Sequence, residues 1–427
     1  MMQNIESRNV LVIAYYFPPM GLSGVQRTLK FVKYLPQFGW QPTILTVTPT
    51  GYYAQDYTLL DELHPQHIEI VRTGSLDPNR LFRKKGVVKM PSERWRKALT
   101  FLSDTFFIPD NKIGWKRRAV KAAEKLFEQK KFDVIFSTAP PFTDFLIGVS
   151  LHNKFHIPLV VDYRDVWHEY PYKYYPTSIH KLMNYKLEKK ALRASSRIIT
   201  TNRRVKELIL KRYKFLQYHD ITILPQGFDP ADYVVDEKIV ISPPKGMRIA
   251  HAGVFYGERT PKYFLRALQK LFADQPHLKN QIEVVFIGTI QDEYITMIKE
   301  MHLDGSVTST GYLDHKHCIA YLQSSDVLWF MLNNDTQSPG KLYEYLGMYK
   351  PILACVPDGF VQQTLKETGG SVIVEPENVN GTAEAILHLY ELYRQKKLPC
   401  PDEEIVQKYN RIELTNELSK MFGFLSE

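Results

Sequence analysis

The sequence lacks three features that would assign it to well-known protein classes. Its three cysteines, Cys318, Cys355 and Cys400, form no CxxC pair and no Cys/His metal spacing. This argues against a disulfide framework or a structural zinc and fits a reducing compartment. No stretch approaches the roughly 20 apolar residues of a transmembrane helix. The N-terminal apolar run leads into Pro18-Pro19 without a cleavage-site pattern. We therefore expect a cytoplasmic protein, either soluble or peripheral on a membrane.

Motifs of several other classes are also missing. No helix-turn-helix, zinc-finger or RNP signature accompanies the net charge of +9, so we expect no nucleic-acid partner. The loop after the first expected strand lacks GxGxxG, and the second expected strand ends TILTVTPTG without an acid, which disfavours an NAD enzyme. The loop Asn333-Asn334-Asp335 holds one acid and no DxD pattern. We therefore expect neither a metal nor a cofactor.

What the sequence does contain is a β/α alternation that occurs twice. At 427 residues the chain is long enough for two or three domains. Short apolar runs that suit buried parallel strands alternate with helical patterns. The expected strands cover 9–17, 41–47, 132–138, 157–163, 196–201 and 221–225, and then 247–255, 282–288, 307–313, 326–332, 351–356 and 371–376. This alternation predicts an α/β protein with two Rossmann-like, doubly wound parallel-sheet domains.

The stretch 226–245 interrupts this alternation, because it is polar, contains prolines and lacks helical periodicity. We interpret it as a linker between an N-terminal domain at 1–225 and a C-terminal domain at 246–401. A helical segment at 402–427 follows, and packing back on the N-terminal domain is one arrangement open to it. Ligands of such sheets bind beyond the carboxyl ends of the strands. We therefore expect both domains to face a central cleft.

Two groups of candidate residues follow strands in the first half. The loop Gly21–Gly24 leads into a helix, where backbone N–H groups can meet an anion, although many βα turns carry glycine. Asp162, Arg164 and Asp165 lie at the end of the run LVVDYRD. Either they face the cleft, with Asp165 as the favoured functional residue, or they form an Arg–Asp pair that fixes the following loop.

Two further groups follow strands in the second half. Gly253 would allow a ligand close to the backbone, and Arg259 would bind phosphate oxygens, although a plain surface arginine also fits the pattern. After the strand DVLWFML, Gly340–Leu342 begin a helix whose free N–H groups and Lys341 ammonium suit a diphosphate. Glu344 can accept hydrogen bonds from two ribose hydroxyls, or it is favoured there only by the helix dipole.

A basic stretch runs from Arg80 to Lys131, with 16 Lys or Arg against 5 Asp or Glu and many apolar residues between them. This composition suits anionic lipid head groups. It equally suits a solvated helix face with a core-facing stripe. The sequence leaves open whether the chain makes peripheral contact with an anionic membrane.

Seven segments along the chain carry a family resemblance. They read AYYFPPMGLSGVQR, STAPPFTDFLIG, IPLVVDYRDVW, ITILPQGFD, HAGVFYGER, GYLDHKHCIAYLQSSDV and SPGKLYEYLGMYKPILA. Together, and in this order, they resemble the family 4 retaining glycosyltransferases of the GT-B fold. The likeness is greatest to the branch that builds bacterial surface polysaccharides. It implies a nucleotide-sugar donor and a glycan or lipid-linked acceptor at the inner face of the membrane.

The resemblance also implies roles for single residues. Gly24 matches a glycine loop that approaches the donor phosphate, and Tyr312 matches a position beside the nucleotide base. Arg259 and Lys341 would hold the donor diphosphate, and Glu344 would bind the nucleotide ribose.

In the first half, Asp165 matches a polar residue near the reacting sugar. Three positions depart from the family pattern. Thr336 stands where a glutamate often binds the donor sugar, Gln226-Gly227 replaces Asn-Gly, and Val254 stands where an arginine often follows the strand glycine.

The implied reaction joins a sugar from a UDP- or GDP-type donor to an acceptor hydroxyl. Arg259, Lys341 and the helix start at Gly340 would stabilise the leaving diphosphate, so no metal is required. The family implies retention of the anomeric configuration, with a donor phosphate oxygen as the proton acceptor. Two alternatives stay open: a nucleotide-sugar-binding or assembly protein without turnover, which Thr336 favours, and a GT-B-like nucleotide-sugar epimerase.

Overall fold

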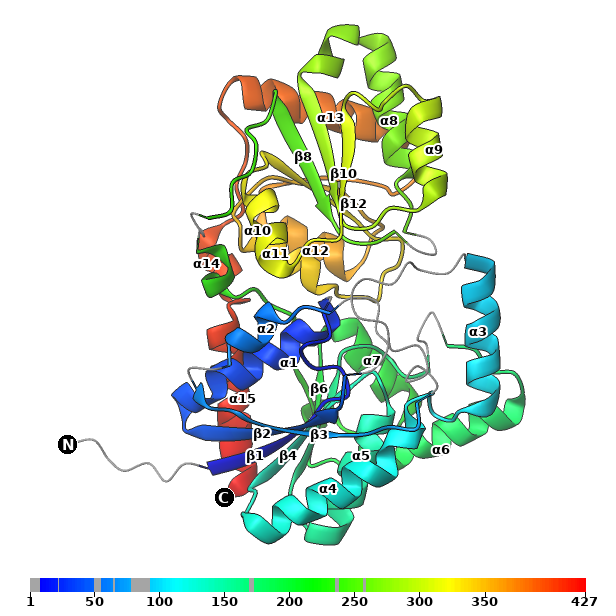
Figure 1. The fold of residues 1–427 in the computed structure, drawn as a ribbon, viewed down its shortest axis with the longest axis vertical. Helices are drawn as coiled ribbons and strands as arrows, with labels where there is room; N and C mark the ends of the chain where they lie inside the picture. Colours follow the sequence, from blue (N-terminus) through cyan, green and yellow to red (C-terminus); the bar gives the residue numbers. More distant parts are fainter. Residues whose placement is uncertain are drawn as a thin grey trace, which may run out of the picture. The chain divides into compact units, whose positions relative to one another are not determined.

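The computed structural model describes residues 8–21, 23–49, 55–63, 66–77, 93–168, 173–234, 238–255 and 259–427. The chain divides into two compact units (Figure 1). The first unit contains Met1–Pro225 and Arg411–Glu427, and the second contains Gln226–Asn410. The chain therefore passes from the first unit to the second and then returns.

The first unit is built on a parallel sheet of seven strands in the order β3-β2-β1-β4-β5-β6-β7. Side chains that point to opposite faces of its central strands are equally buried, so helices cover both faces. The strands are β1 (Arg8–Ile13), β2 (Trp40–Val47), β3 (Glu69–Thr73), β4 (Val134–Ala139), β5 (Leu159–Tyr163), β6 (Arg197–Thr200) and β7 (Ile221–Ile223). The helices are α1 (Ser23–Tyr34), α2 (Thr58–Asp61), α3 (Glu93–Phe106), α4 (Lys116–Gln129), α5 (Thr143–Phe155), α6 (Ser178–Ala194), α7 (Arg203–Arg212) and α15 (Arg411–Ser426).

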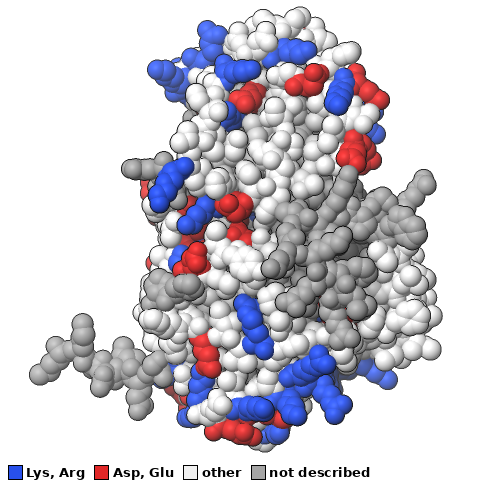
Figure 2. Space-filling model, in the orientation of Figure 1, with Lys and Arg blue, Asp and Glu red and all other residues white. Residues whose placement is uncertain are grey.

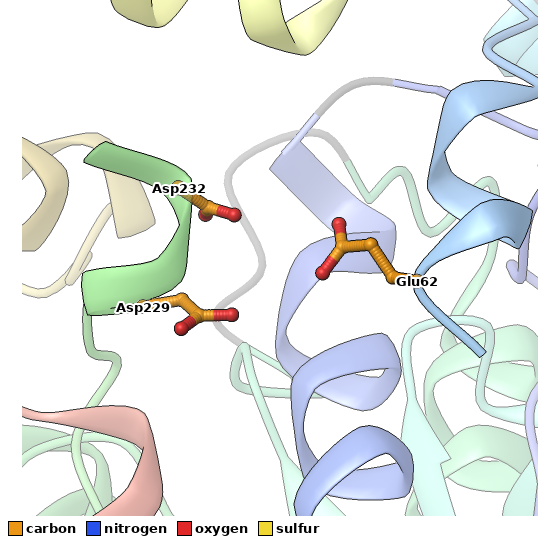
Figure 3. A group of neighbouring side chains, drawn as sticks. All are labelled: Glu62, Asp229 and Asp232. Carbon is orange, nitrogen blue, oxygen red and sulfur yellow. The ribbon is translucent and has the colours of Figure 1, made fainter. Parts of the chain in front are cut away.

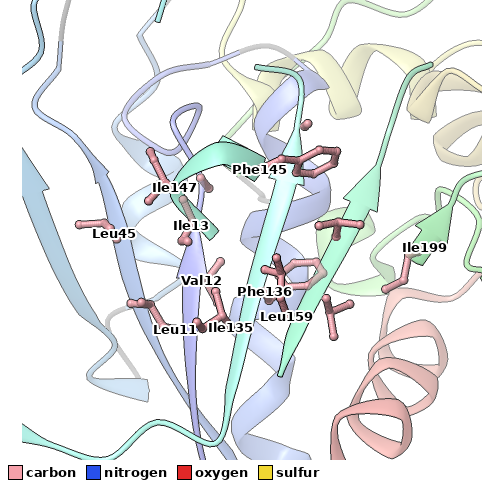
Figure 4. Packing of buried hydrophobic residues seen from close by; sticks show 14 of the residues in the cluster. Leu11, Val12, Ile13, Leu45, Ile135, Phe136, Phe145, Ile147, Leu159 and Ile199 are labelled. Carbon is pink, nitrogen blue, oxygen red and sulfur yellow. The ribbon is translucent and has the colours of Figure 1, made fainter. Parts of the chain in front are cut away.

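The core of the first unit includes a helix from the far end of the sequence. Figure 4 shows neighbouring side chains of β1 pointing to alternate faces and packing beside Phe136 of β4. Phe422 of α15 meets the ring of Trp40 at 5.3 Å and that of Phe136 at 5.7 Å between centroids. Leu414 and Leu418 are buried in the same cluster. Helix α15 is therefore an integral part of this core.

The second unit repeats the architecture with six parallel strands in the order β10-β9-β8-β11-β12-β13. The strands are β8 (Met247–Ala252), β9 (Ile282–Ile287), β10 (Val307–Gly311), β11 (Val327–Met331), β12 (Ile352–Cys355) and β13 (Ser371–Val374). The helices are α8 (Lys262–Asp274), α9 (Asp292–Glu300), α10 (His315–Gln323), α11 (Gly340–Leu346), α12 (Phe360–Thr368), α13 (Val379–Arg394) and α14 (Glu403–Gln407). Two apolar clusters, one on each face of the sheet, form its core. The predicted fold class is confirmed.

Each sheet has one point where the strand order reverses. In the first sheet it lies between β1 and β4, and in the second it lies between β8 and β11. Doubly wound sheets bind ligands beyond the carboxyl ends of the strands at such a switch point. The loops after these four strands are therefore where ligand-binding residues are expected.

The structure differs from the expected elements at several boundaries. Helix α1 ends at Tyr34 and gives way to a 3₁₀ turn, because Pro36 removes a backbone donor. The stretch expected as a linker contains a 3₁₀ turn, η6 (Pro230–Tyr233), within the second unit. The segment expected as one helix after residue 402 divides into α14 and α15. Strand β3 and helices α2, α3 and α12 were not expected.

Candidate functional site

The candidates of the second unit centre on an ion pair in α11. Lys341 Nζ donates to Glu344 Oε2 at 2.8 Å. Burial alone would lower the pKa of Lys341, but the Glu344 carboxylate outweighs burial, and the net pKa lies above its usual value. Burial alone would raise the pKa of Glu344, but the Lys341 ammonium holds that pKa below its usual value. Both groups are therefore charged at neutral pH.

Helix α11 contributes to this site mainly through its side chains. It has seven residues, so its dipole is short. The Leu342 side chain is fully buried in the core, and the Leu342 N–H donates to the Pro339 carbonyl at 3.1 Å. A Cβ at Gly340 would meet no heavy atom within 4 Å, so space for a ligand is open at this residue.

Arg259 joins the loops on the two sides of the switch point. Its Nη2 donates to Gln337 Oε1 at 2.7 Å. Gln337 lies between β11 and α11 and is itself held by Asn334, whose Oδ1 accepts from the Gln337 N–H at 2.9 Å and whose Nδ2 donates to Gln337 Oε1 at 3.0 Å. Arg259 therefore lies with the β11–α11 loop that carries Lys341.

A buried histidine that we did not predict lies among these groups. His251 Nδ1 is 3.0 Å from the Trp329 carbonyl, and its ring stacks on Phe255 at 4.9 Å. Burial, together with the smaller effects of the Lys341 and Arg259 charges, lowers the pKa of His251 to about 4. The imidazole is therefore neutral at pH 7. Since a carbonyl only accepts, Nδ1 carries the proton and Nε2 is the acceptor. The sequence signal was a histidine inside the mainly apolar run MRIAHAGVF.

Two glycines make a close backbone approach beyond β8 and β9. Gly253 has φ of 152° and Gly288 has φ of 141°. A Cβ at Gly288 would lie 2.4 Å from the Gly253 carbonyl oxygen, so no side chain fits there. Gly288 also forms an isolated bridge with Gly311, the residue before the half-buried Tyr312. The structure thus brings the predicted positions Gly253 and Tyr312 into neighbouring loops.

In the first unit, an arginine holds together the loops after β1 and β4. Arg164 donates from Nη1 to the Gly24 carbonyl and from Nη2 to the Pro140 carbonyl. These loops flank the switch point of the first sheet. Asp165 follows directly and is half-buried. Arg164 therefore fixes the predicted glycine loop, a role that sequence analysis missed.

The first acid of the DYRD segment has a structural partner. Arg27 donates from Nε and Nη2 to the two carboxylate oxygens of Asp162, at 3.0 and 2.9 Å. Thr138 Oγ1 donates to the same carboxylate at 2.8 Å. Both Arg27 and Asp162 are buried. An Arg–Asp pair does stabilise this strand end, but its arginine comes from α1 and not from the segment itself.

A second buried acid near this switch point has a raised pKa. Asp144, in the first turn of α5, accepts from the Tyr15 N–H at 2.8 Å. Burial raises the pKa of Asp144 well above its usual value. Its Oδ1 has no hydrogen-bond partner among the described residues. Burial of this acid therefore disfavours its charged form.

Figure 3 shows three carboxylates that belong to different units. Glu62, which follows α2 in the first unit, accepts from Lys30 at 2.7 Å. In the second unit, Asp229 accepts from the Ala231 N–H at 3.0 Å, and Asp232 is 3.1 Å from His315 Nε2. Each acid therefore has a protein partner in its own unit.

The basic stretch is described only in part. Residues 80–92, which include Arg83, Lys84, Lys85 and Lys89, lie outside the described residues. Further along, α4 bears exposed cations, and Figure 2 shows Lys and Arg side chains gathered where Figure 1 places this helix. Among the described residues, no helix has the length and apolarity needed to cross a membrane.

Comparisons with known proteins cover both units. Residues 23–232 match the family described as Glycosyltransferase Family 4, and residues 246–392 match the family described as Glycosyl transferases group 1. No protein of curated function matches the chain in sequence.

Solved structures share the fold over the whole chain. HepE (Alr3699) of Anabaena, in complex with UDP and glucose, has a TM-score of 0.64 at 12% identity, with 98% of this chain and 100% of that chain covered. A glycosyltransferase of Rickettsia africae has a TM-score of 0.64 at 16% identity, with 98% of both chains covered. Sucrose-phosphate synthase of Thermosynechococcus elongatus has a TM-score of 0.61 at 14% identity, with 98% and 99% covered. With both sheets and both family matches in agreement, the chain belongs to the family 4-like glycosyltransferases of the GT-B fold.

Proposed function

We propose that this glycosyltransferase transfers a sugar from a UDP- or GDP-type nucleotide sugar to a hydroxyl of a glycan or lipid-linked acceptor. We further propose that the reaction retains the anomeric configuration, needs no metal, and takes place in the cytoplasm at the inner face of the membrane. The observation that carries the proposal is the group of Lys341, Glu344 and Arg259 at the switch point of the second sheet.

The charges of this group suit a nucleoside diphosphate. Arg259 and Lys341 offer cations for the phosphate oxygens, and Gly253 leaves the backbone accessible beside them. Glu344 keeps its charge and can accept from ribose hydroxyls through the oxygen that does not bind Lys341. Two fixed cations stabilise the leaving diphosphate without reorganisation, which is how preorganised sites lower a barrier. The complex of HepE with UDP supports uracil as the base of the donor nucleotide.

The proposed reaction changes the following bonds. The C1–O bond to the diphosphate breaks, and the acceptor oxygen forms a new bond to C1 on the same face of the sugar. The acceptor proton passes to a phosphate oxygen of the leaving group. We assign acceptor binding to the first unit, where Asp165 lies near the switch point and Arg164 fixes the neighbouring segments, and we keep Gly24 as a residue that approaches the donor phosphate.

The experiment that tests this proposal is a panel of nucleotide sugars with hydrolysis and transfer measured separately. Release of UDP or GDP, and glycosylation of an added acceptor, are the expected results for at least one donor. Lys270→Ala, at an exposed lysine of α8, is the matched control and should retain full activity. Tight nucleotide binding without turnover across the panel would support the binding-protein alternative. Recovery of the released or bound sugar as its epimer would support the epimerase alternative.

A further inference from the structure

Large apolar side chains are exposed together on two helices of the first unit. On α3 they are Leu99, Leu102 and Phe106, which the i, i+3, i+7 spacing places on one face. On α6 they are Ile179, Leu182 and Met183, spaced i, i+3, i+4. These six side chains are 44–76% exposed. We call them the α3–α6 surface.

Direct contacts hold the two parts of this surface together. The rings of Phe101 and Tyr174 meet at 5.3 Å between centroids. The Tyr174 N–H donates to Asp104 Oδ2 at 2.8 Å, and His180 Nε2 lies 3.0 Å from the Thr105 carbonyl. The C-terminal end of α3 is therefore fixed beside the start of α6, and the exposed side chains belong to one ordered region of the first unit.

The charges around this surface have one sign. Lys181, Lys186 and Lys190 of α6 are exposed, and the last two continue the face of Ile179 at i+7 and i+11. The described stretches 98–116 and 173–194 hold three acids, and none of them is exposed.

Each of these acids has a protein partner. Asp104 is paired with Lys173, and Asp110 accepts from the Thr143 N–H. Glu188 is buried and accepts from the hydroxyl of Tyr213. The exposed charge on these stretches is therefore cationic.

We infer that the α3–α6 surface docks the first unit on an anionic lipid bilayer, with the apolar side chains in the interfacial region and the lysines at the lipid head groups. Exposed apolar side chains in a contiguous group mark interaction sites. An apolar helical face bordered by lysines and without exposed acids matches an anionic membrane in both hydrophobicity and charge. The inference rests on the membrane part of the proposed function and assigns the membrane contact to the α3–α6 surface and its neighbouring lysines. It does not depend on the predicted basic residues at 83–89.

Vesicle co-sedimentation of the full chain tests this inference. Wild type should bind phosphatidylglycerol-containing vesicles better than pure phosphatidylcholine vesicles, and more strongly at low salt than at high salt. Leu102→Ser/Phe106→Ser should lower partitioning to both vesicle types by more than about ten-fold, because apolar insertion is lost. The control is Phe424→Ser on α15, since Phe424 is 71% exposed and Phe106 is 76% exposed.

A second pair of variants separates charge from insertion. Neutralising Lys181, Lys186 and Lys190 to Gln should lower partitioning to anionic vesicles on the order of 100-fold and leave neutral vesicles unaffected. The control neutralises three exposed lysines of the second unit, Lys279, Lys299 and Lys396, to Gln. If the test and control variants lost vesicle partitioning equally, the inference would be overturned. Exposed lysines or apolar side chains anywhere on the protein would then account for vesicle binding.

Two further measurements distinguish the remaining outcomes. If wild type self-associates without vesicles and Leu102→Ser/Phe106→Ser abolishes this, the surface joins two copies of the chain, and the lipid assignment is wrong. UDP affinity, measured on the same proteins, should be unchanged in every variant. Wild type that binds UDP but no vesicles overturns this inference alone, whereas wild type that binds vesicles but no nucleotide overturns the proposed donor site alone.

Discussion

Lys341→Ala tests the proposed donor site most directly. The ammonium lies 2.8 Å from a buried carboxylate and has a raised pKa, so it is a fixed cation at any pH at which the enzyme works. Removing one preorganised donor from developing negative charge costs about 3–4 kcal/mol of transition-state stabilisation. We therefore expect kcat for sugar transfer and for donor hydrolysis to fall by about 10²–10³-fold.

The same substitution also affects stability, and this effect has to be separated. It leaves the Glu344 carboxylate, 8% exposed, without its ammonium partner. Breaking a buried pair in this way costs about 3–5 kcal/mol of unfolding free energy. Because the Lys341 side chain is 21% exposed, water reduces this to about 1–3 kcal/mol.

A double variant makes the separation. Lys341→Ala/Glu344→Gln removes the unpaired charge, so the free energy of unfolding should recover much of the loss, while kcat should stay low. The free energy of unfolding and kcat should be measured for four proteins: wild type, the single variant, the double variant and Lys270→Ala. Transfer and hydrolysis that both survive Lys341→Ala within a few-fold would refute the diphosphate assignment. A return of kcat in the double variant would show that the loss was one of folding.

Three more outcomes are expected. Transfer should persist in excess EDTA; complete loss that magnesium or manganese restores would contradict the metal-independent leaving-group site. His251, with a pKa of about 4 in the folded protein against 6.5 unfolded, binds a proton first in the unfolded chain as pH falls. The titration of His251 should therefore lower the free energy of unfolding by about 3 kcal/mol as the pH falls from 6.5 to 4. His251→Asn should reduce this dependence of the unfolding free energy on pH, measured by urea unfolding. Arg164→Ala should lower kcat/KM by about 10–100-fold through loss of charged hydrogen bonds, and Arg164→Lys should recover part of this loss. An equal loss in both variants would contradict this positioning role.

The fold was predictable because strands of a parallel sheet are buried on both faces. Such strands are short apolar runs, as in VIFSTA and VLWFM, and the helices between them have their own periodicity. The same reasoning failed for β3 at the sheet edge, where Glu69 and Arg72 leave no apolar run. It also missed α3, whose exposed apolar residues do not follow the usual pattern of a core-facing helix.

The candidate site was predictable where its residues are local in sequence. Lys341 and Glu344 are three apart on one helix, so their ion pair follows from helical geometry. The role of Arg164 was not predictable, since its two carbonyl partners lie 140 and 24 residues away along the chain. The neutral state of His251 likewise depends on a burial that only the folded second unit creates.

The position of α15 has a consequence for biosynthesis. This helix follows the whole second unit in the chain, yet Leu418 and Phe422 complete the core of the first. A ribosome therefore finishes the second unit before the first one can close, and a fragment ending at Pro225 would emerge with an open groove beside Trp40 and Phe136. In this chain the first unit to begin folding is the last to be completed.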